Sequence, residues 1–221
     1  MEKTPILAIM YDFDHTLSPR DMQEYGFIPD LGMEADVFWN KCLKAMKRNQ
    51  MDQILAYMYM MLEEAKGKLI VNRNMLRALG KDVQLFDGVS DWFARVNEYA
   101  RSRGLQPEHY IISSGLKEII EGTPIAKEFK EIYAASFCYD EHGVACWPAM
   151  AVNYTSKTQF LFRVNKGVLD VTEHRALNEF MPEEKRRVPF SNMIYVGDGL
   201  TDVPSCLLYT SDAADDSLRV D

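Results

Sequence analysis

The feature that most constrains this chain is an apolar run that ends in two closely spaced aspartates. The run extends from Ile6 to Tyr11, and Asp12 and Asp14 follow it directly. Its length and composition are typical of a buried strand, whereas carboxylates are costly to bury without partners. In an α/β sheet, ligands bind at the carboxyl ends of the parallel strands. The run therefore predicts a buried strand that carries two acidic groups to the edge of a binding site.

A second segment near the other end of the chain repeats this pattern. Residues 192–196 form a mainly apolar run, which leads into Asp198 and Asp202. Gly197 and Gly199 flank the first of these aspartates, which suits a tight strand exit with a close backbone approach. This segment predicts a second strand that ends in carboxylates.

Two further segments supply groups that favour a bound anion. An apolar run ends in Ser113 and Ser114 just before a helical pattern, and hydroxyl and free N–H groups at a helix start form an anion cradle. Lys157 lies in the first turn of another predicted helix, where the helix dipole disfavours a cation. Its position indicates a nearby anion. Lys166, late in the same helix, remains an alternative for this role.

Together these four segments resemble the motifs of the haloacid dehalogenase superfamily of phosphatases. The family motifs are Asp-x-Asp-x-Thr-Leu, a strand ending in Ser or Thr, a lysine, and Gly-Asp-x-x-x-Asp. The matching residues are, in this order, Asp12, Asp14, Thr16 and Leu17, then Ser113, then Lys157 as the best candidate, then Gly197, Asp198 and Asp202. The order and spacing also fit, and the resemblance extends from residue 6 to about residue 205.

The resemblance implies a discontinuous catalytic core with an inserted cap. Residues 1–17 and 87–205 would form a Rossmann-like parallel α/β sheet of order 3-2-1-4-5, with the first-motif strand in the centre. Residues 18–86 would form a helical cap over the active site, and helical periodicity is present at 33–48, 51–66 and 74–79. A cap after the first motif, with a hairpin before the lysine, is similar to the layout of phosphoserine phosphatases. That analogy concerns architecture and carries no specificity.

Residues 206–221 depart from the family pattern. The family would continue with a helix, a fifth strand and a closing helix, for which 16 residues are too few. This tail also resembles translated vector sequence. We therefore expect a truncated gene in which the fifth strand is missing and residues 206–221 are non-native or disordered.

The resemblance also implies catalytic roles for the first-motif aspartates. Asp12 would attack phosphorus as the nucleophile, because a carboxylate can divide one difficult displacement into two easier steps. Asp14 would protonate the leaving oxygen and then activate water as general acid and base. An acid two residues after the nucleophile is typical of the phosphatases and phosphotransferases in this superfamily, and the dehalogenases lack it.

The remaining motif residues would hold the phosphoryl group and a metal ion. Ser113, Ser114 and Lys157 would bind the phosphoryl oxygens. Mg²⁺, which prefers oxygen ligands, would be held by the carboxylates of Asp12 and Asp198 and by the backbone carbonyl of Asp14. Asp202 would orient the metal ligands or their waters.

Composition narrows the functional class further. A net charge of −8 disfavours a nucleic-acid or anionic-membrane surface. No stretch approaches the length of a membrane span, no signal peptide precedes the first strand, and the four cysteines have no metal-binding spacing. We therefore predict a cytoplasmic, Mg²⁺-dependent phosphomonoester hydrolase that acts on a small phosphorylated metabolite. The alternatives are a phosphotransferase or mutase of the same superfamily, or an inactive truncated fragment. The sequence specifies neither the substrate nor the oligomeric state.

Overall fold

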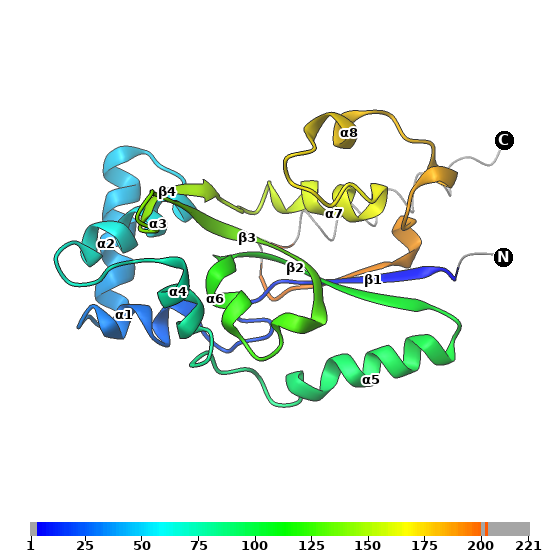
Figure 1. The fold of residues 1–221 in the computed structure, drawn as a ribbon, viewed down its shortest axis with the longest axis horizontal. Helices are drawn as coiled ribbons and strands as arrows, with labels where there is room; N and C mark the ends of the chain where they lie inside the picture. The colour runs from blue at the N-terminus through cyan, green and yellow to red at the C-terminus, as the bar shows by residue number, and fades with distance from the viewer. Residues whose placement is uncertain (1–3, 200–201, 203–221) are drawn as a thin grey trace.

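The computed structural model describes residues 4–199 and residue 202, and its centre is a parallel-dominated sheet (Figure 1). Within these residues the sheet has five strands in the order β4-β3-β2-β1-β5. The strands are β1 (Ile6–Tyr11), β2 (Gln106–Leu116), β3 (Phe129–Tyr139), β4 (Ala145–Met150) and β5 (Met193–Val196). β1 is parallel to β2 and β5, β2 is parallel to β3, and β4 is antiparallel to β3. The predicted α/β class, the central first-motif strand and the 3-2-1-4 order of the parallel strands are confirmed.

Strand β1 is apolar throughout because both of its faces are covered. Ile9 and Tyr11 belong to one buried cluster, whereas Ala8 and Met10 belong to a second cluster on the opposite face. Alternate residues of a strand point to opposite faces, so a strand covered on both sides needs apolar residues at every position. Figure 1 shows α5 (Val89–Ser102) below the sheet and α7 (Lys157–Lys166) above it.

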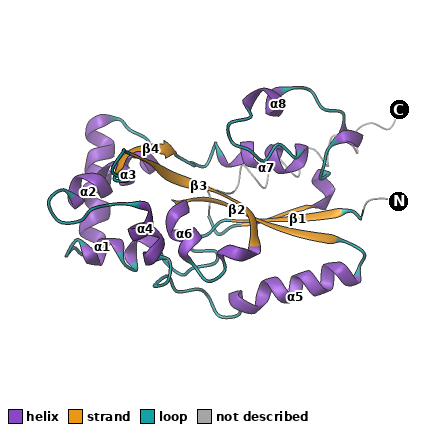
Figure 2. Cartoon of the chain, in the orientation of Figure 1, coloured by secondary structure: helices purple, strands orange, loops and turns teal. Residues whose placement is uncertain are grey.

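Helices from residue 89 onward flank the sheet, as Figure 2 shows for α5 and α7. They are α5 (Val89–Ser102), α6 (Lys117–Gly122), η2 (Ala126–Glu128), α7 (Lys157–Lys166), α8 (His174–Asn178), η3 (Glu183–Lys185) and η4 (Phe190–Asn192). Phe93 of α5 and Ile119 of α6 enter the first cluster, and Phe160 and Val164 of α7 enter the second. The sheet therefore lies between two apolar layers, which holds the carboxyl ends of its strands in fixed positions.

Residues 18–86, which we name the cap segment, are mainly helical. They contain η1 (Met22–Glu24), α1 (Phe27–Asp30), α2 (Ala35–Asn49), α3 (Gln53–Ala65) and α4 (Arg73–Leu79). The Asp52 side chain caps α3 by accepting hydrogen bonds from the backbone N–H groups of Ile54 and Leu55. The three longer helices lie where the periodicity predicts them. The division of the chain into core and cap stays a prediction.

Helix α4 of the cap segment touches α6 through the backbone. A side chain at Gly122 would collide with the carbonyl of Arg77, and one at Gly80 would collide with the carbonyl of Ile119. The absence of Cβ at both positions therefore permits this close approach.

Strand β2 differs from its prediction at the carboxyl end. It continues past Ser113 to Leu116, with a register shift between these residues, and α6 begins only at Lys117. The extended backbone persists because Gly115 lets it pass close to Met22 and Asp14, where a Cβ would collide with the methionine side chain.

The predicted hairpin before Lys157 is present. Asp140 accepts hydrogen bonds from the backbone N–H groups of His142 and Val144, both at 2.9 Å, and so closes the turn between β3 and β4. Strand β4 is at one edge of the sheet, the position where Pro148 is tolerated.

Two sequence predictions concern membranes and the tail. None of the helices within the described ranges is both long and apolar enough to cross a bilayer. The prediction for residues 206–221 lies outside the described residues.

Candidate active site

The carboxyl end of β1 places Asp12 at the base of a cleft. The backbone N–H of Asp12 donates to the Val196 carbonyl at 2.9 Å, which ties the end of β1 to β5. One carboxylate oxygen of Asp12 accepts a hydrogen bond from the Phe13 N–H at 2.7 Å. The residue is buried, and burial raises the pKa of its carboxyl, which the cation of Lys157 opposes. Asp12 therefore has a fixed position and a defined orientation.

Lys157 joins the two predicted acidic motifs. Its Nζ is 2.7 Å from Asp12 Oδ2 and 2.7 Å from Asp202 Oδ1, and the lysine is fully buried at the start of α7. Burial disfavours its charge, but the two carboxylates outweigh that effect and raise the pKa of Lys157. Asp202 also accepts a hydrogen bond from the Tyr195 hydroxyl at 2.7 Å. The lysine thus stays charged between two anions.

The alternative lysine lies elsewhere. Lys166 is in the last turn of α7, and its Nζ donates to the carbonyls of Leu177 and Glu179 at 2.7 and 2.8 Å. Of the two lysines considered, Lys157 is the one that contacts the aspartates.

Asp14 lies beside this ion-pair cluster and is partly buried. Its Oδ1 accepts a hydrogen bond from the Met22 N–H at 3.0 Å. Burial, followed by the negative charges of Asp21 and Asp12, raises the pKa of Asp14 well above its ordinary value. A carboxyl group in this setting holds a proton at a pH where an exposed aspartate is ionised.

The carboxyl end of β2 brings Ser113 and Ser114 to the same edge of the sheet. Ser113 is fully buried, and its hydroxyl accepts a hydrogen bond from the Gly115 N–H at 3.0 Å. The backbone carbonyl of Ser114 accepts a hydrogen bond from the Tyr57 hydroxyl of α3 at 2.7 Å. This bond connects the cap segment directly to the predicted phosphate-binding strand.

Three carboxylates converge in a way that suits a hard cation. Ligand oxygens of Asp12, Asp198 and Asp202 all lie within 4.8 Å of one another. Thr16 donates a hydrogen bond to Asp198 Oδ1 at 3.4 Å. A set of carboxylate oxygens suits Mg²⁺, which prefers oxygen ligands, better than it suits a transition metal that prefers sulfur or nitrogen ligands. The structure therefore places Asp202 in the same acidic cluster as Asp12 and Asp198, and its predicted outer role stays a prediction.

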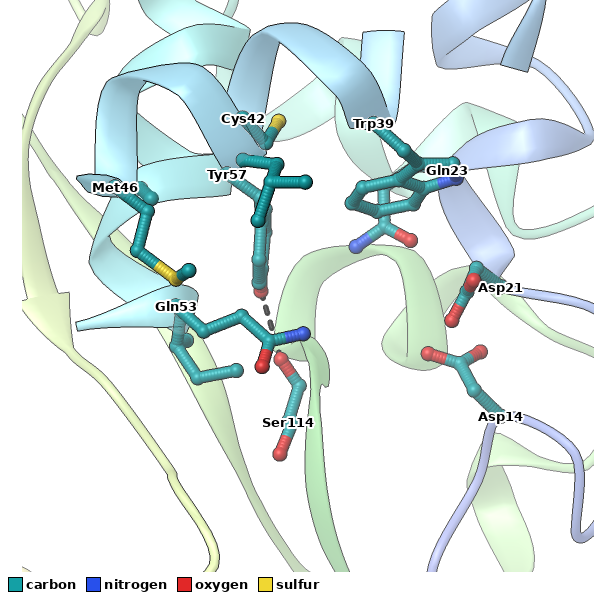
Figure 3. Close-up of a pocket in the computed structure, with 12 residues that line it drawn as sticks. Asp14, Asp21, Gln23, Trp39, Cys42, Met46, Gln53, Tyr57 and Ser114 are labelled. Atoms are coloured by element: carbon teal, nitrogen blue, oxygen red, sulfur yellow. Dashed lines mark hydrogen bonds between the residues drawn. The ribbon is translucent and has the colours of Figure 1, made fainter. Parts of the chain in front are cut away.

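Two adjoining cavities open at this edge of the sheet. One, of about 480 Å³, is lined by Asp12, Asp14, Ser113, Ser114 and Asp198 together with residues of the cap segment. The second, of about 420 Å³, extends under α2 and α3 and shares Asp14 and Ser114 with the first (Figure 3). Predicted groups from three separate segments thus line one cleft with a side pocket, and the buried Lys157 lies behind Asp12.

The side pocket contains residues that the sequence analysis did not identify. Asp21, Gln23, Trp39 and Tyr57 line it. They carry no motif, and the helical spacing of Trp39 is equally typical of a core position. The only sequence signal for this pocket was Gln23, a polar residue beside the apolar Met22 near the start of the cap segment.

Similarity to known proteins extends over most of the chain. A model of the haloacid dehalogenase-like hydrolase family matches residues 9–206. An uncharacterized protein of Borreliella burgdorferi is 26% identical over 230 residues. The match covers 92% of this chain and 78% of the Borreliella protein.

Solved structures are similar in fold at low identity. A haloacid dehalogenase family hydrolase from Salmonella enterica serovar Typhi has a TM-score of 0.59 at 15% identity, and the match covers 91% of this chain but only 59% of that protein. A phosphoserine phosphatase with bound substrate has a TM-score of 0.58 at 14% identity. The match covers 91% of this chain and 81% of the phosphatase chain. Such distant likeness establishes the fold alone.

Proposed function

Because the chain belongs to the haloacid dehalogenase-like hydrolases, we propose that it is a Mg²⁺-dependent phosphomonoester hydrolase that uses an aspartyl-phosphate intermediate. The observation that carries the proposal is the position of Asp12, paired with Lys157 and adjacent to Asp14, at the carboxyl end of the central strand. A small phosphorylated metabolite is the proposed substrate.

The proposed first step transfers the phosphoryl group to the protein. A carboxylate oxygen of Asp12 forms a bond to phosphorus while the bond from phosphorus to the ester oxygen breaks. Asp14 gives its proton to that oxygen, so that a neutral alcohol leaves. The raised pKa of Asp14 supports this role, because the group must be protonated before the reaction.

The proposed second step restores the enzyme. Asp14, now ionised, takes a proton from water as the water oxygen attacks phosphorus. The bond between phosphorus and Asp12 breaks, and inorganic phosphate is released. Ser113, the N–H groups of Phe13 and Ser114, and Lys157 would bind the phosphoryl oxygens as their charge is redistributed.

A metal ion fits the acidic groups of this site. Asp12 and Asp198 would hold Mg²⁺ through their carboxylates and Asp14 through its backbone carbonyl, while Asp202 stays aligned by Lys157 and Tyr195. When bound, the ion neutralises the repulsion between the anionic nucleophile and the phosphate. Asp202 is close enough to act as a direct ligand if Lys157 turns to the phosphate.

A phosphotransferase or mutase would use the same first step. It would differ only in the acceptor, which would be an alcohol or a second phosphate-binding substrate instead of water. Cytoplasmic location and the absence of a nucleic-acid or membrane partner remain predictions from composition.

The test is phosphate release from p-nitrophenyl phosphate by the purified chain. We expect release that depends on MgCl₂, stops with a chelator and is lost in Asp12→Asn. Equal release with and without chelator, or from Asp12→Asn, would overturn the proposal. In the presence of added alcohols, formation of a new phosphate ester faster than phosphate release would favour the phosphotransferase.

A further inference from the structure

The side pocket next to Asp14 is the place where the leaving group of a substrate would lie. Asp14, Asp21, Gln53, Ile54 and Ser114 line both this pocket and the cleft over Asp12. A phosphoryl group bound at Asp12 would direct its ester oxygen toward Asp14, and the alcohol beyond that oxygen would enter the pocket. The residues that line the pocket therefore indicate which chemical groups the alcohol carries.

The walls of the pocket carry negative charge and no lysine or arginine. Among the described residues that line the cleft and the pocket, the ionisable side chains beyond Asp12, Asp14 and Asp198 are Asp21, Asp52 and His15. Lys157 is fully buried and already paired with two carboxylates. A carboxylate on the leaving group would find no free cation here, and anions facing Asp21 would be repelled.

Gln23 is a buried polar group that lacks a partner. It is 2% exposed, lines the pocket, and its Oε1 accepts no hydrogen bond from the described residues. Figure 3 shows its amide directed into the pocket below Trp39. An unpaired buried acceptor is costly, so this atom indicates a ligand that donates an N–H or O–H.

Asp21 is a second acceptor near the same space. Its recorded ion pair is with the exposed His15, at 3.7 Å, and the imidazole is a cation only when protonated. The carboxylate of Asp52, in contrast, accepts hydrogen bonds from the Ile54 N–H at the start of α3 and from the side-chain amide of Asn153 at 3.1 Å. Of these two lining carboxylates, Asp21 is therefore the one with fewer contacts to the protein and more capacity to bind a cationic group.

Trp39 adds an aromatic surface to these acceptors. Its indole N–H donates to Glu24 at 2.8 Å, and its ring packs edge-on against Tyr57 at 6.3 Å between ring centres. These contacts fix the ring at the wall of the pocket (Figure 3). Aromatic faces attract ammonium groups.

We propose that the leaving alcohol of the substrate carries a primary ammonium group and no carboxylate, with Asp21 and Gln23 accepting its hydrogen bonds beside Trp39. This inference rests on the proposed phosphatase activity and adds the substrate class, an ω-aminoalkyl phosphate. It distinguishes the chain from enzymes that act on phosphorylated amino acids, which must also bind a carboxylate.

The test compares substrates that differ only in the terminal group. The probes are 2-aminoethyl, 3-aminopropyl and 4-aminobutyl phosphate, each paired with its methyl isostere, n-propyl, n-butyl or n-pentyl phosphate. We expect kcat/KM to favour the amine by about tenfold or more at one chain length at least, as charge-assisted hydrogen bonds do. Phosphoserine and phosphocholine should be poorer than 2-aminoethyl phosphate, because one adds a carboxylate and the other lacks an N–H.

Variants assign the effect to the pocket. Asp21→Asn and Gln23→Met should each bring the amine-to-methyl ratio of kcat/KM toward one, and Asp21→Glu should keep the preference. Asp36→Asn is the matched control, because it removes the same charge from an exposed position on α2 outside the pocket. Thermal unfolding of each variant checks that it is folded.

The outcomes separate the two proposals. If the unmodified chain shows no Mg²⁺-dependent hydrolysis of p-nitrophenyl phosphate, the phosphatase assignment itself is overturned. Normal hydrolysis of that probe, with equal kcat/KM within every amine–methyl pair or with phosphoserine preferred, would overturn only the inference about the pocket. A preference for amines that persists in both Asp21→Asn and Gln23→Met would show that these residues do not provide it.

Discussion

The two ends of the site differ in how their charges are satisfied. At the end of β1, Lys157 pairs with Asp12 and Asp202 at 2.7 Å, and Tyr195 adds a further bond to Asp202. In the side pocket, the Oε1 of Gln23 has no partner among the described residues. Groups that perform a reaction gain from being held in place by the chain, whereas groups that recognise a ligand must keep a bonding position open. The comparison therefore distinguishes the reactive end from the recognition end.

The largest effect is expected when the nucleophile is changed at the paired end. Asp12→Asn should lower kcat by several orders of magnitude, because an amide is a far weaker nucleophile than a carboxylate. Phosphate release and circular dichroism measure activity and folding together. A folded variant that keeps more than about a tenth of the wild-type rate would remove Asp12 from this role.

Asp14 lines both the cleft and the side pocket, and Asp14→Asn tests its proposed role as the proton donor. The amide keeps the backbone carbonyl but cannot exchange a proton, so kcat should fall by about 10²- to 10⁴-fold for alkyl phosphates. The loss should shrink for phosphates with very acidic leaving groups, which need no protonation. A series of aryl and alkyl esters checks this, and an equal loss across the series would contradict a general-acid role.

The ion-pair cluster should contribute to stability as well as to activity. Lys157→Met leaves two buried carboxylates without their cation and should lower the free energy of unfolding by about 3–5 kcal/mol at neutral pH. Lys166→Met, the control, removes bonds to two carbonyls and should cost only about 1–2 kcal/mol. Urea denaturation measures both.

The pH dependence of this stabilisation has a definite sign. The pKa of Lys157 is raised in the folded protein, so the stabilisation from its charge is complete below the ordinary lysine pKa. It is lost only as the pH rises through the raised value. A Lys157→Met variant no less stable than Lys166→Met near neutral pH would show that the cluster is not a net source of stability.

The smallest effect is expected from the charge of Asp21 on Asp14. After burial, Asp21 is the next largest cause of the raised pKa of Asp14. Activity that needs protonated Asp14 declines as the pH rises through that pKa, so Asp21→Asn should move the alkaline limb of kcat/KM to lower pH. The profile is measured with n-propyl phosphate, which lacks an amine. A limb that moves as little as in Asp36→Asn would mean that the two carboxyl groups are not coupled.

Sequence reasoning succeeds for the reactive end because each of its residues is fixed by a strand or helix terminus. Asp12, Ser113 and Asp198 follow apolar runs, and such runs identify strands whose carboxyl ends meet at one edge of a sheet. Lys157 could be placed by its unfavourable position in a first helical turn. The sequence could not separate it from Lys166, because the choice depends on which face of α7 meets the sheet.

The recognition end could not be predicted for the opposite reason. Gln23 and Trp39 line the pocket through the packing of η1 and α2, which no local pattern encodes. Local patterns also fell short at the end of β2, which was expected to end at Ser113 and Ser114 but continues to Leu116. The backbone there stays extended because Gly115 fits against Met22, a contact 93 positions away in the chain that periodicity cannot reveal.

The glycine contact between α4 and α6 has an evolutionary consequence. Any side chain at Gly80 or Gly122 would enter the backbone of the other helix, so neither position can vary unless the helices separate. The residues of α2 and α3 that line the pocket do so with side chains, and none of them is a glycine at a backbone contact. Descendants of this chain can therefore acquire new substrates through mutations in α2 and α3, while the α4–α6 contact preserves the attachment of the cap segment.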